Sequence, residues 1–180
     1  MSDPYAAYRA GSTEPWTVDL LCALVRAMQP HILIETGTFE ARTTVKLVEA
    51  MDSYGPAHGA ALFTIEADSQ RAAGARAVLN EIRVRTPNLG VQLVEGDALA
   101  FLRAQPEASV EFVFLDDDHT AQHVADEVEA ALRILRPGGL VCLHDVVGLF
   151  GLDAIVRHYG GLVFDLPRLH ASGGLGVIAK

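Results

Sequence analysis

A short apolar run that leads through a glycine turn into a helix is the feature that most constrains this chain. His-Ile-Leu-Ile at residues 31–34 predicts a buried strand, Glu35-Thr36-Gly37-Thr38 predicts a turn, and residues 41–51 predict a helix. The turn exposes backbone N–H groups at a helix start, where the helix dipole favours a carboxylate or a phosphate. Glu35, at the carboxyl end of the strand, disfavours a pyrophosphate and favours a ligand that carries an ammonium group. The unit therefore predicts a ligand site at one edge of an α/β sheet.

Strand-like and helix-like segments alternate through the rest of the chain. Further strands are expected at residues 61–66, 91–94, 110–115 and 140–143, and an antiparallel pair at 162–166 and 175–179. Helices are expected from Ser12 or Thr13 to Pro30, from Asp68 or Ser69 to Pro87, from Ala98, around Val124 to Leu135, and around Leu152 to Tyr159. This alternation implies a mainly parallel sheet with right-handed crossovers. We expect one α/β domain over residues 1–180, with residues 1–14 as an arm.

The bulk properties exclude several classes of function. A formal net charge of -9 over 180 residues argues against a nucleic-acid partner, which needs a basic face. No apolar run approaches the roughly 18 residues of a membrane span, and the N-terminal residues lack a secretory pattern. Cys22 and Cys142 form neither a disulfide framework nor a metal-binding spacing. We expect a soluble cytoplasmic domain.

Acidic residues follow all five central strands. They are Glu35, Glu66, Asp97, Asp116 and Asp145. In a parallel sheet these strand ends share one edge, and five carboxylates gathered there repel one another unless they bind a cation, hydrogen-bond donors or a metal. An acid after the second strand suits the hydroxyls of a ribose. Helix capping is the alternative role for such residues and is preferred for Asp68 and Asp117.

Two histidine-containing clusters lie at the ends of the fourth and fifth strands. Asp116-Asp117-Asp118-His119 follows one strand, and His144-Asp145 follows the other. Carboxylates and imidazoles can bind a divalent cation or act as an acid–base pair. The remaining candidates are weaker: His58, His123, His158 and His170 are expected on the surface, and Tyr5, Tyr8 and Trp16 either cover a bound cofactor or pack the arm.

Five stretches in this order resemble the class I S-adenosylmethionine-dependent methyltransferases, specifically the small-molecule O-methyltransferase branch. They are Ile-Glu-Thr-Gly-Thr-Phe-Glu-Ala-Arg-Thr-Thr, Phe-Thr-Ile-Glu-Ala-Asp, Val-Glu-Gly-Asp-Ala, Phe-Leu-Asp-Asp-Asp-His and Leu-Arg-Pro-Gly-Gly-Leu-Val-Cys-Leu-His-Asp. The resemblance implies a Rossmann-like seven-stranded sheet of order 3-2-1-4-5-7-6, with the last strand antiparallel and helices on both faces. One departure from the family pattern is Ala41, which replaces the usual second glycine of the turn.

The resemblance also implies a set of cofactor-binding residues. The turn after the first strand would meet the methionine end of S-adenosylmethionine, Glu66 would hold the ribose hydroxyls, and residues 96–98 would flank the adenine. The complete set is Glu35, Thr36, Gly37, Thr38, Phe39, Thr43, Glu66, Gly96, Asp97, Ala98 and Asp116.

In metal-dependent members of that branch, acids after the fourth and fifth strands bind Mg²⁺. The matching residues here are Asp116 or Asp118, together with Asp145. Val146 stands where these members have a second ligand, and a valine side chain cannot bind a metal. The alternatives are that His144 replaces this ligand, or that His119 or His144 acts as a metal-free general base.

The sequence thus predicts methyl transfer to a hydroxyl of a small molecule, with catalytic roles for Asp116, His119, His144 and Asp145. His144, His119 or a carboxylate of the cluster would be the base. A metal-dependent hydroxylase on the same fold and a non-catalytic cofactor-binding module are the alternatives. A dinucleotide-dependent oxidoreductase is disfavoured because the Gly-x-Gly-x-x-Gly turn is missing. No lid-forming insertion is evident, which leaves open a lid supplied by a second subunit in a homodimer.

Overall fold

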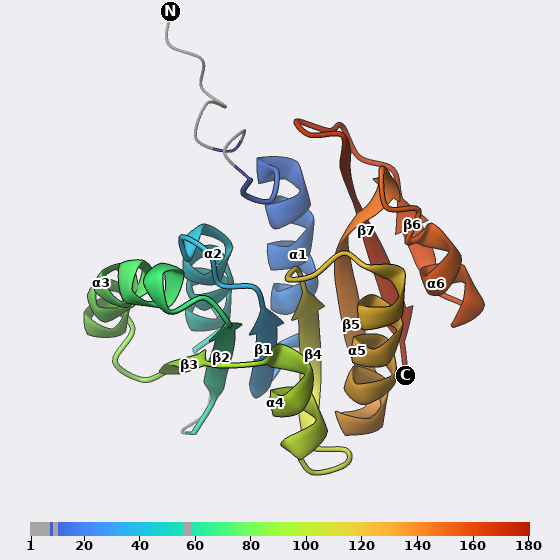
Figure 1. Ribbon diagram of the computed structural model, residues 1–180. Coiled ribbons are helices and arrows are strands. Elements are labelled where there is room, and N and C mark those ends of the chain that lie inside the picture. Colours follow the sequence, from blue (N-terminus) through green and yellow to red (C-terminus); the bar gives the residue numbers. More distant parts are fainter. Residues whose placement is uncertain (1–7, 9–10, 56–58) are drawn as a thin grey trace, which may run out of the picture.

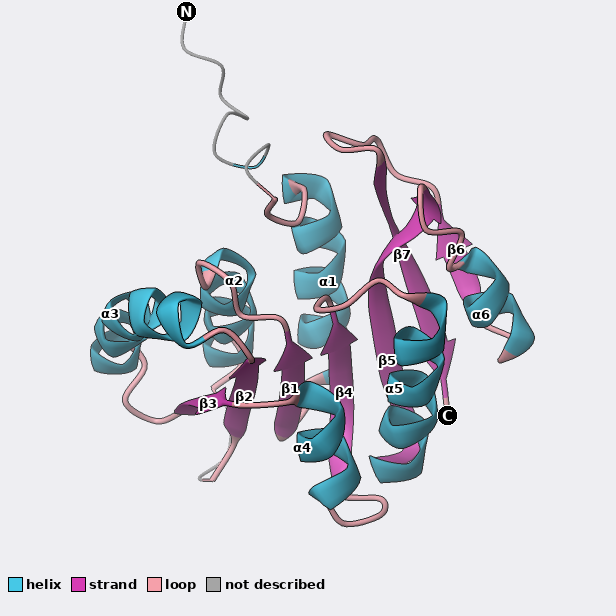
Figure 2. Ribbon diagram, viewed as in Figure 1, coloured by secondary structure: helices cyan, strands magenta, loops and turns pink. Residues whose placement is uncertain are grey.

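The structure is a computed structural model that describes residues 8, 11–55 and 59–180. Helices and strands alternate along the chain (Figures 1 and 2). The strands are β1 (Ile32–Thr36), β2 (Ala61–Glu66), β3 (Gly90–Glu95), β4 (Val110–Leu115), β5 (Leu135–Gly148), β6 (Leu162–Phe164) and β7 (Ser172–Ala179). The helices are α1 (Pro15–Met28), α2 (Arg42–Asp52), α3 (Ser69–Arg85), α4 (Ala98–Ala104), α5 (Ala121–Ile134) and α6 (Asp153–His158).

All seven of these strands form one sheet in the order β3-β2-β1-β4-β5-β7-β6. The first five are parallel, with Glu35 opposite Thr64 on one side and Phe114 on the other. Strand β7 runs antiparallel to both β5 and β6. The expected topology and the expected antiparallel pair are confirmed.

Helices cover both faces of the sheet, as expected when the strands are apolar on both sides. Helices α1, α2 and α3 pack on one face, with Leu21, Leu47 and Leu79 in their core. Helices α4, α5 and α6 pack on the other face, with Leu102 and Val128 in theirs (Figure 1). The parallel strands therefore all present their carboxyl ends at one edge of the sheet, where α1 also begins.

Strand β5 is much longer than the predicted strand at 140–143. It begins at Leu135, which was expected on the preceding helix, and it continues to Gly148 because its pairing with β7 extends that far. The pairing register shifts between His144 and Val147. His144 and Asp145 therefore lie within the strand, next to this irregularity, and not beyond its end.

Smaller boundary differences affect three other elements. Strand β1 ends at Thr36, so Glu35 lies inside it, and β7 begins at Ser172. Helix α6 is shorter than predicted: Leu152 and Tyr159, which were expected on the helix, flank it on either side. None of the helices in the described part of the chain is long and apolar enough to cross a membrane.

The end of the predicted N-terminal arm is part of the folded core. Thr13 and Glu14 are buried, and α1 starts directly after them with Pro15 in its first turn. Proline is favoured there because its missing N–H has no partner in a first turn. Tyr5 and His58, which the sequence analysis considered, lie outside the described residues.

Candidate functional site

A cavity of about 610 Å³ opens at the carboxyl ends of the parallel strands. The turn after β1 and the end of β2 form one wall, and the loop after β4, the middle of β5 and the segment before α1 form the other. It is lined by Gly11, Ser12, Thr13, Gly37, Thr38, Phe39, Glu40, Arg42, Thr43, Ile65, Glu66, Ala67, Asp68, Arg71, Gly96, Ala98, Asp116, Asp117, Asp118, His119, His144, Asp145 and His170. We call this cavity the crevice.

Gly37 lets the turn after β1 touch the loop after β4. Its φ of +82° favours glycine, and a Cβ atom at this position would lie 2.1 Å from the carbonyl oxygen of Asp116. The N–H groups of Gly37 and Thr38 both donate to the carbonyl of Ile65, at 3.0 and 3.2 Å. The turn is therefore fixed against two neighbouring strands, and no other residue type fits at position 37 without displacing the backbone.

Glu66 stands at the end of β2 and borders the crevice, as the sequence predicted. Its Oε2 accepts the N–H of Phe39 at 2.8 Å, and its Oε1 accepts the N–H of Asp68 at 3.0 Å. Each carboxylate oxygen has two lone pairs, so both can accept a further hydrogen bond from a ligand. The backbone thus holds Glu66 in a fixed orientation beside the crevice.

Asp68 and Asp97 act as helix caps. Asp68 accepts the N–H groups of Gln70 and Arg71 at the start of α3, and Asp97 accepts that of Ala100 at the start of α4. Capping was expected for Asp68. For Asp97 the sequence predicted a cofactor contact, yet its side chain is absent from the crevice lining, where its neighbours Gly96 and Ala98 are present.

Glu35 and Thr36 are buried in β1 and do not line the crevice. The Oε2 of Glu35 lies 2.6 Å from the hydroxyl of Thr44, which donates to it from the first turn of α2. Burial raises the pKa of Glu35 to about 8. The prediction that Glu35 presents a negative charge to a ligand therefore finds no support in this geometry: its carboxyl is buried and protonated at neutral pH.

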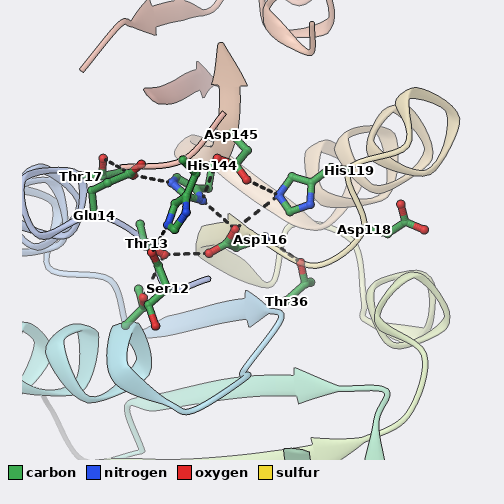
Figure 3. Close-up of polar contacts among 12 residues, drawn as sticks. Ser12, Thr13, Glu14, Thr17, Thr36, Asp116, Asp118, His119, His144 and Asp145 are labelled. Carbon is green, nitrogen blue, oxygen red and sulfur yellow. Dashed lines mark hydrogen bonds and ion pairs between the residues drawn. The ribbon is translucent and has the colours of Figure 1, made fainter. Parts of the chain in front are cut away.

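His144 lies between two carboxylates (Figure 3). Its Nδ1 is 2.9 Å from Oδ1 of Asp116, and its Nε2 is 2.9 Å from Oε2 of Glu14. Burial opposes the charged ring, but the charge and hydrogen bond of Asp116, the hydrogen bond of Glu14 and the charge of Asp145 raise the pKa of His144 well above 6.5. The pKa of Asp116 is lowered in turn: burial opposes this, and the positive His144 outweighs it. The ring is therefore an imidazolium that donates from both nitrogens.

His119 is the second histidine of this cluster and is less buried. Its Nε2 lies 3.2 Å from Oδ2 of Asp145 and 3.6 Å from Oδ1 of Asp116, and its ring stacks on Phe150. Burial lowers its pKa, but Asp116 and Asp145 together raise it above 6.5. Asp145 itself has a φ of 56° beside the irregularity in β5. That strained backbone turns Asp145 toward His119, as often found at functional sites.

Asp118 does not join the other acids. Figure 3 shows it pointing away from Asp116 and Asp145, and its Oδ1 accepts the N–H of Thr120 just before α5 at 2.7 Å. Of the predicted metal ligands Asp116, Asp118 and Asp145, the structure brings Asp116 and Asp145 together and leaves Asp118 apart, because Asp118 accepts a backbone N–H in the loop before α5. Among the described residues, the side chains close enough to share a metal here are Asp116, His119 and His144.

Three further residues of the site, Ser12, Thr13 and Glu14, were not predicted from the sequence to have a role there. Thr13 donates to Oδ2 of Asp116 at 2.8 Å and accepts from Thr43 at 3.1 Å. Ser12 lines the crevice with a buried hydroxyl that has no hydrogen-bond partner in the described part of the chain. Ser-Thr-Glu before Pro15 looks like an ordinary helix start, and no local signal links it to residues more than 100 positions away.

Two histidines expected on the surface are also placed differently: His170 lines the crevice, and His123 packs against Asp117 and Glu127.

Comparison with known proteins identifies the fold. The sheet order and overall structure are those of the Rossmann-like methyltransferase fold. The O-methyltransferase from Bacillus cereus, solved with S-adenosylhomocysteine, aligns with a TM-score of 0.73 and 21% identity over 97% of this chain and 86% of its own. The O-methyltransferase TomG from Streptomyces achromogenes, solved with S-adenosylmethionine, aligns with a TM-score of 0.73 and 19% identity over 100% of this chain and 91% of its own.

A family model described as a methyltransferase domain matches residues 34–146. This range is more than half of the chain and contains most of the crevice, so the chain belongs to the methyltransferase domain family. None of the curated proteins compared with it matches its sequence.

Proposed function

We propose that this protein transfers the methyl group of S-adenosylmethionine to a hydroxyl group of a small molecule. The observation that carries the proposal is the crevice, which joins a nucleoside-type wall at Gly37, Glu66 and Ala98 to a histidine and carboxylate cluster. Donor and acceptor would therefore meet in one cavity, and aligning two reactants is the main task of an enzyme in such a transfer.

The residues of the first wall fit S-adenosylmethionine. Glu66, held by two backbone N–H groups, would accept the ribose hydroxyls, while Gly96 and Ala98 leave the space beside it open to the adenine. Ser12, Thr13 and Thr43 face the same cavity with hydroxyl groups for the methionine end. When bound, the cofactor supplies a methyl group made electrophilic by the sulfonium. Glu35 would act indirectly, by fixing the start of α2 through Thr44.

We assign the general base to His119. His144 is unsuited to this role because both of its nitrogens donate to carboxylates and its pKa is raised well above the usual value. In His119, Nε2 is buried and faces Asp116 and Asp145. That arrangement keeps the proton on Nε2 and leaves Nδ1 able to accept one, as in other histidines oriented by a carboxylate.

With the cofactor bound, the acceptor oxygen would take the methyl group, and the carbon–sulfur electron pair would stay on the sulfur of the leaving S-adenosylhomocysteine. The hydroxyl proton passes to Nδ1 of His119, and Asp145 stabilises the resulting imidazolium through Nε2. Asp116 takes no proton, because its pKa is lowered and His144 and Thr13 occupy its two oxygens.

The donor set does not fit Mg²⁺, which prefers an octahedron of oxygen ligands. Asp116 already bonds His144 and Thr13, Asp118 points away, and Val146 is apolar and buried. Of Asp116, Asp118 and Asp145, it is Asp145 whose Oδ1 is buried without a hydrogen-bond partner among the described residues. We therefore propose a route in which His119 removes the proton without a divalent cation at this position.

The proposal is tested by incubating the protein with S-adenosylmethionine labelled in its methyl group and a panel of phenols, sugars and hydroxylated acids. We expect label in a methyl ether of one acceptor class, at a rate that added Mg²⁺ does not change. Label transferred to nitrogen or carbon acceptors instead would contradict the proposed reaction, and a strict need for Mg²⁺ would contradict the assignment of the base.

A further inference from the structure

A second group of acidic and histidine side chains lies outside the proposed catalytic cluster. Asp117 follows β4, while His123 and Glu127 lie one turn apart on α5. Nε2 of His123 is 3.2 Å from Oδ2 of Asp117 and 3.7 Å from Oε2 of Glu127. One nitrogen and one oxygen from each acid all lie within 4.8 Å of one another. The three side chains thus converge on one point between β4 and α5.

Glu127 is the most unusual member of this group. It is fully buried, and among the described residues neither of its oxygens has a hydrogen-bond partner of normal geometry; Oδ1 of Asp117 is likewise buried and unpartnered there. Buried carboxyl oxygens without donors are costly and rare in folded proteins. His123 supplies a single N–H, which reaches Asp117. The described residues therefore leave three buried acid oxygens that a positive ion would satisfy.

The pKa of Glu127 is raised, so a metal ion would have to displace a proton from its carboxyl group. Burial and the adjacent carboxylate of Asp117 raise it to about 10, although the Thr36 hydroxyl acts in the opposite direction. Without a cation the carboxyl stays protonated, and a metal ion would displace that proton, as metal ligation by carboxylates does in general.

We propose that Asp117, His123 and Glu127 form a binding site for a divalent transition-metal ion that ties the end of β4 to α5. One imidazole nitrogen and two carboxylate oxygens suit Zn²⁺, whereas Mg²⁺ and Ca²⁺ prefer oxygen ligands alone. Asp117 also borders the crevice, from which an ion and a fourth, water ligand can enter. The bound ion would hold the loop of residues 116–120, which carries Asp116 and His119. This inference is independent of the proposed methyl transfer.

The test uses Co²⁺ as a visible probe for the Zn²⁺ site. Protein freed of metal with a chelator is titrated with Co²⁺, and the absorption between about 500 and 650 nm follows four- or five-coordinate metal. We expect one equivalent to bind, to be displaced by Zn²⁺, and to raise the midpoint of thermal unfolding, since a ligand that binds only the folded state stabilises it.

Three variants locate the ion. His123→Asn, at a partly exposed position, and Glu127→Gln should each weaken Co²⁺ binding by about tenfold or more, in line with the loss of one ligand. The matched control His119→Asn alters the other histidine cluster and should change the affinity less than about threefold. If Glu127→Gln does not fold, His123→Asn alone decides the question. Absence of a cobalt band would overturn the proposal in favour of a proton shared by Asp117 and Glu127, and binding lost only in His119→Asn would place the metal in the crevice instead.

Discussion

Glu14 and His144 are 130 residues apart in sequence, yet their Oε2 and Nε2 atoms lie 2.9 Å apart. Both side chains are buried, and the contact joins the start of α1 to the middle of β5. Thr17 and the N–H of Leu169 approach the same Glu14 carboxylate, each at 3.4 Å. This ion pair therefore fixes the segment before α1 over the crevice and holds the His144 ring in its charged form.

Glu14→Gln should destabilise the protein strongly. The amide cannot balance the buried imidazolium, and breaking a buried ion pair by removing one partner costs about 3 to 5 kcal/mol. Chemical unfolding followed by fluorescence measures the change in the free energy of unfolding. Glu107→Gln, at an exposed position in a loop, is the matched control and should change it by less than about 0.5 kcal/mol. Equal stabilities for both variants would show that the Glu14–His144 pair contributes nothing.

Glu35→Gln should change how stability depends on pH. The pKa of Glu35 is raised by burial from 4.5 to about 8, so between these values the folded protein holds a proton that the unfolded chain has lost. The wild-type free energy of unfolding therefore falls as pH rises, by about 1.4 kcal/mol per pH unit from this group. Between about pH 5 and about pH 7, the free energy of unfolding of the wild type should therefore fall by about 3 kcal/mol relative to that of the variant. Parallel stability curves would contradict a buried, protonated Glu35.

The fold could be predicted from sequence because each strand is a short apolar run and each connection has a local turn or cap signal. The wall of the crevice formed by the ends of β1 and β2 could be predicted from the same pattern, since Gly37 and Glu66 stand where strands end. The opposite wall, formed by the loop after β4, by β5 and by the segment before α1, could not be predicted in this way. The packing of α1 brings Thr13 to Asp116 and Glu14 to His144, and no local sequence pattern predicts this packing. Strand β5 contains His144 and Asp145 because its pairing with β7 continues beyond the apolar residues of the strand.

Glu66→Gln should weaken binding of S-adenosylhomocysteine. The variant replaces a charged acceptor of the ribose hydroxyls by a neutral one, and hydrogen bonds to charged groups contribute about 1.5 to 3 kcal/mol, or roughly 10- to 100-fold in affinity. Isothermal titration calorimetry measures this. The control is Glu95→Gln at the end of the adjacent strand β3, where Glu95 pairs with Arg76 on the surface. An affinity loss of the same size in both variants would argue against a ribose contact by Glu66.

His119→Ala should abolish most of the methyl transfer while cofactor binding persists. Losing a general base typically costs about 100- to 10,000-fold in rate. In the wild type, kcat should rise with pH through the raised pKa of His119 and then level off, because the base must be unprotonated. The His119→Ala variant should lack this rise of kcat with pH. The control variant His158→Ala, at an exposed position, should keep the rise. A pH profile retained in His119→Ala would assign the base to another residue.

The most direct test of the central claim is calorimetric titration of the protein with S-adenosylmethionine, with and without Mg²⁺. A methyltransferase crevice with Glu66 and Gly37 at one wall predicts one site of micromolar affinity, and the donor set around Asp116 predicts the same affinity in both buffers. Binding only with Mg²⁺ would contradict the metal-free assignment. No binding in either buffer would contradict the proposed function itself.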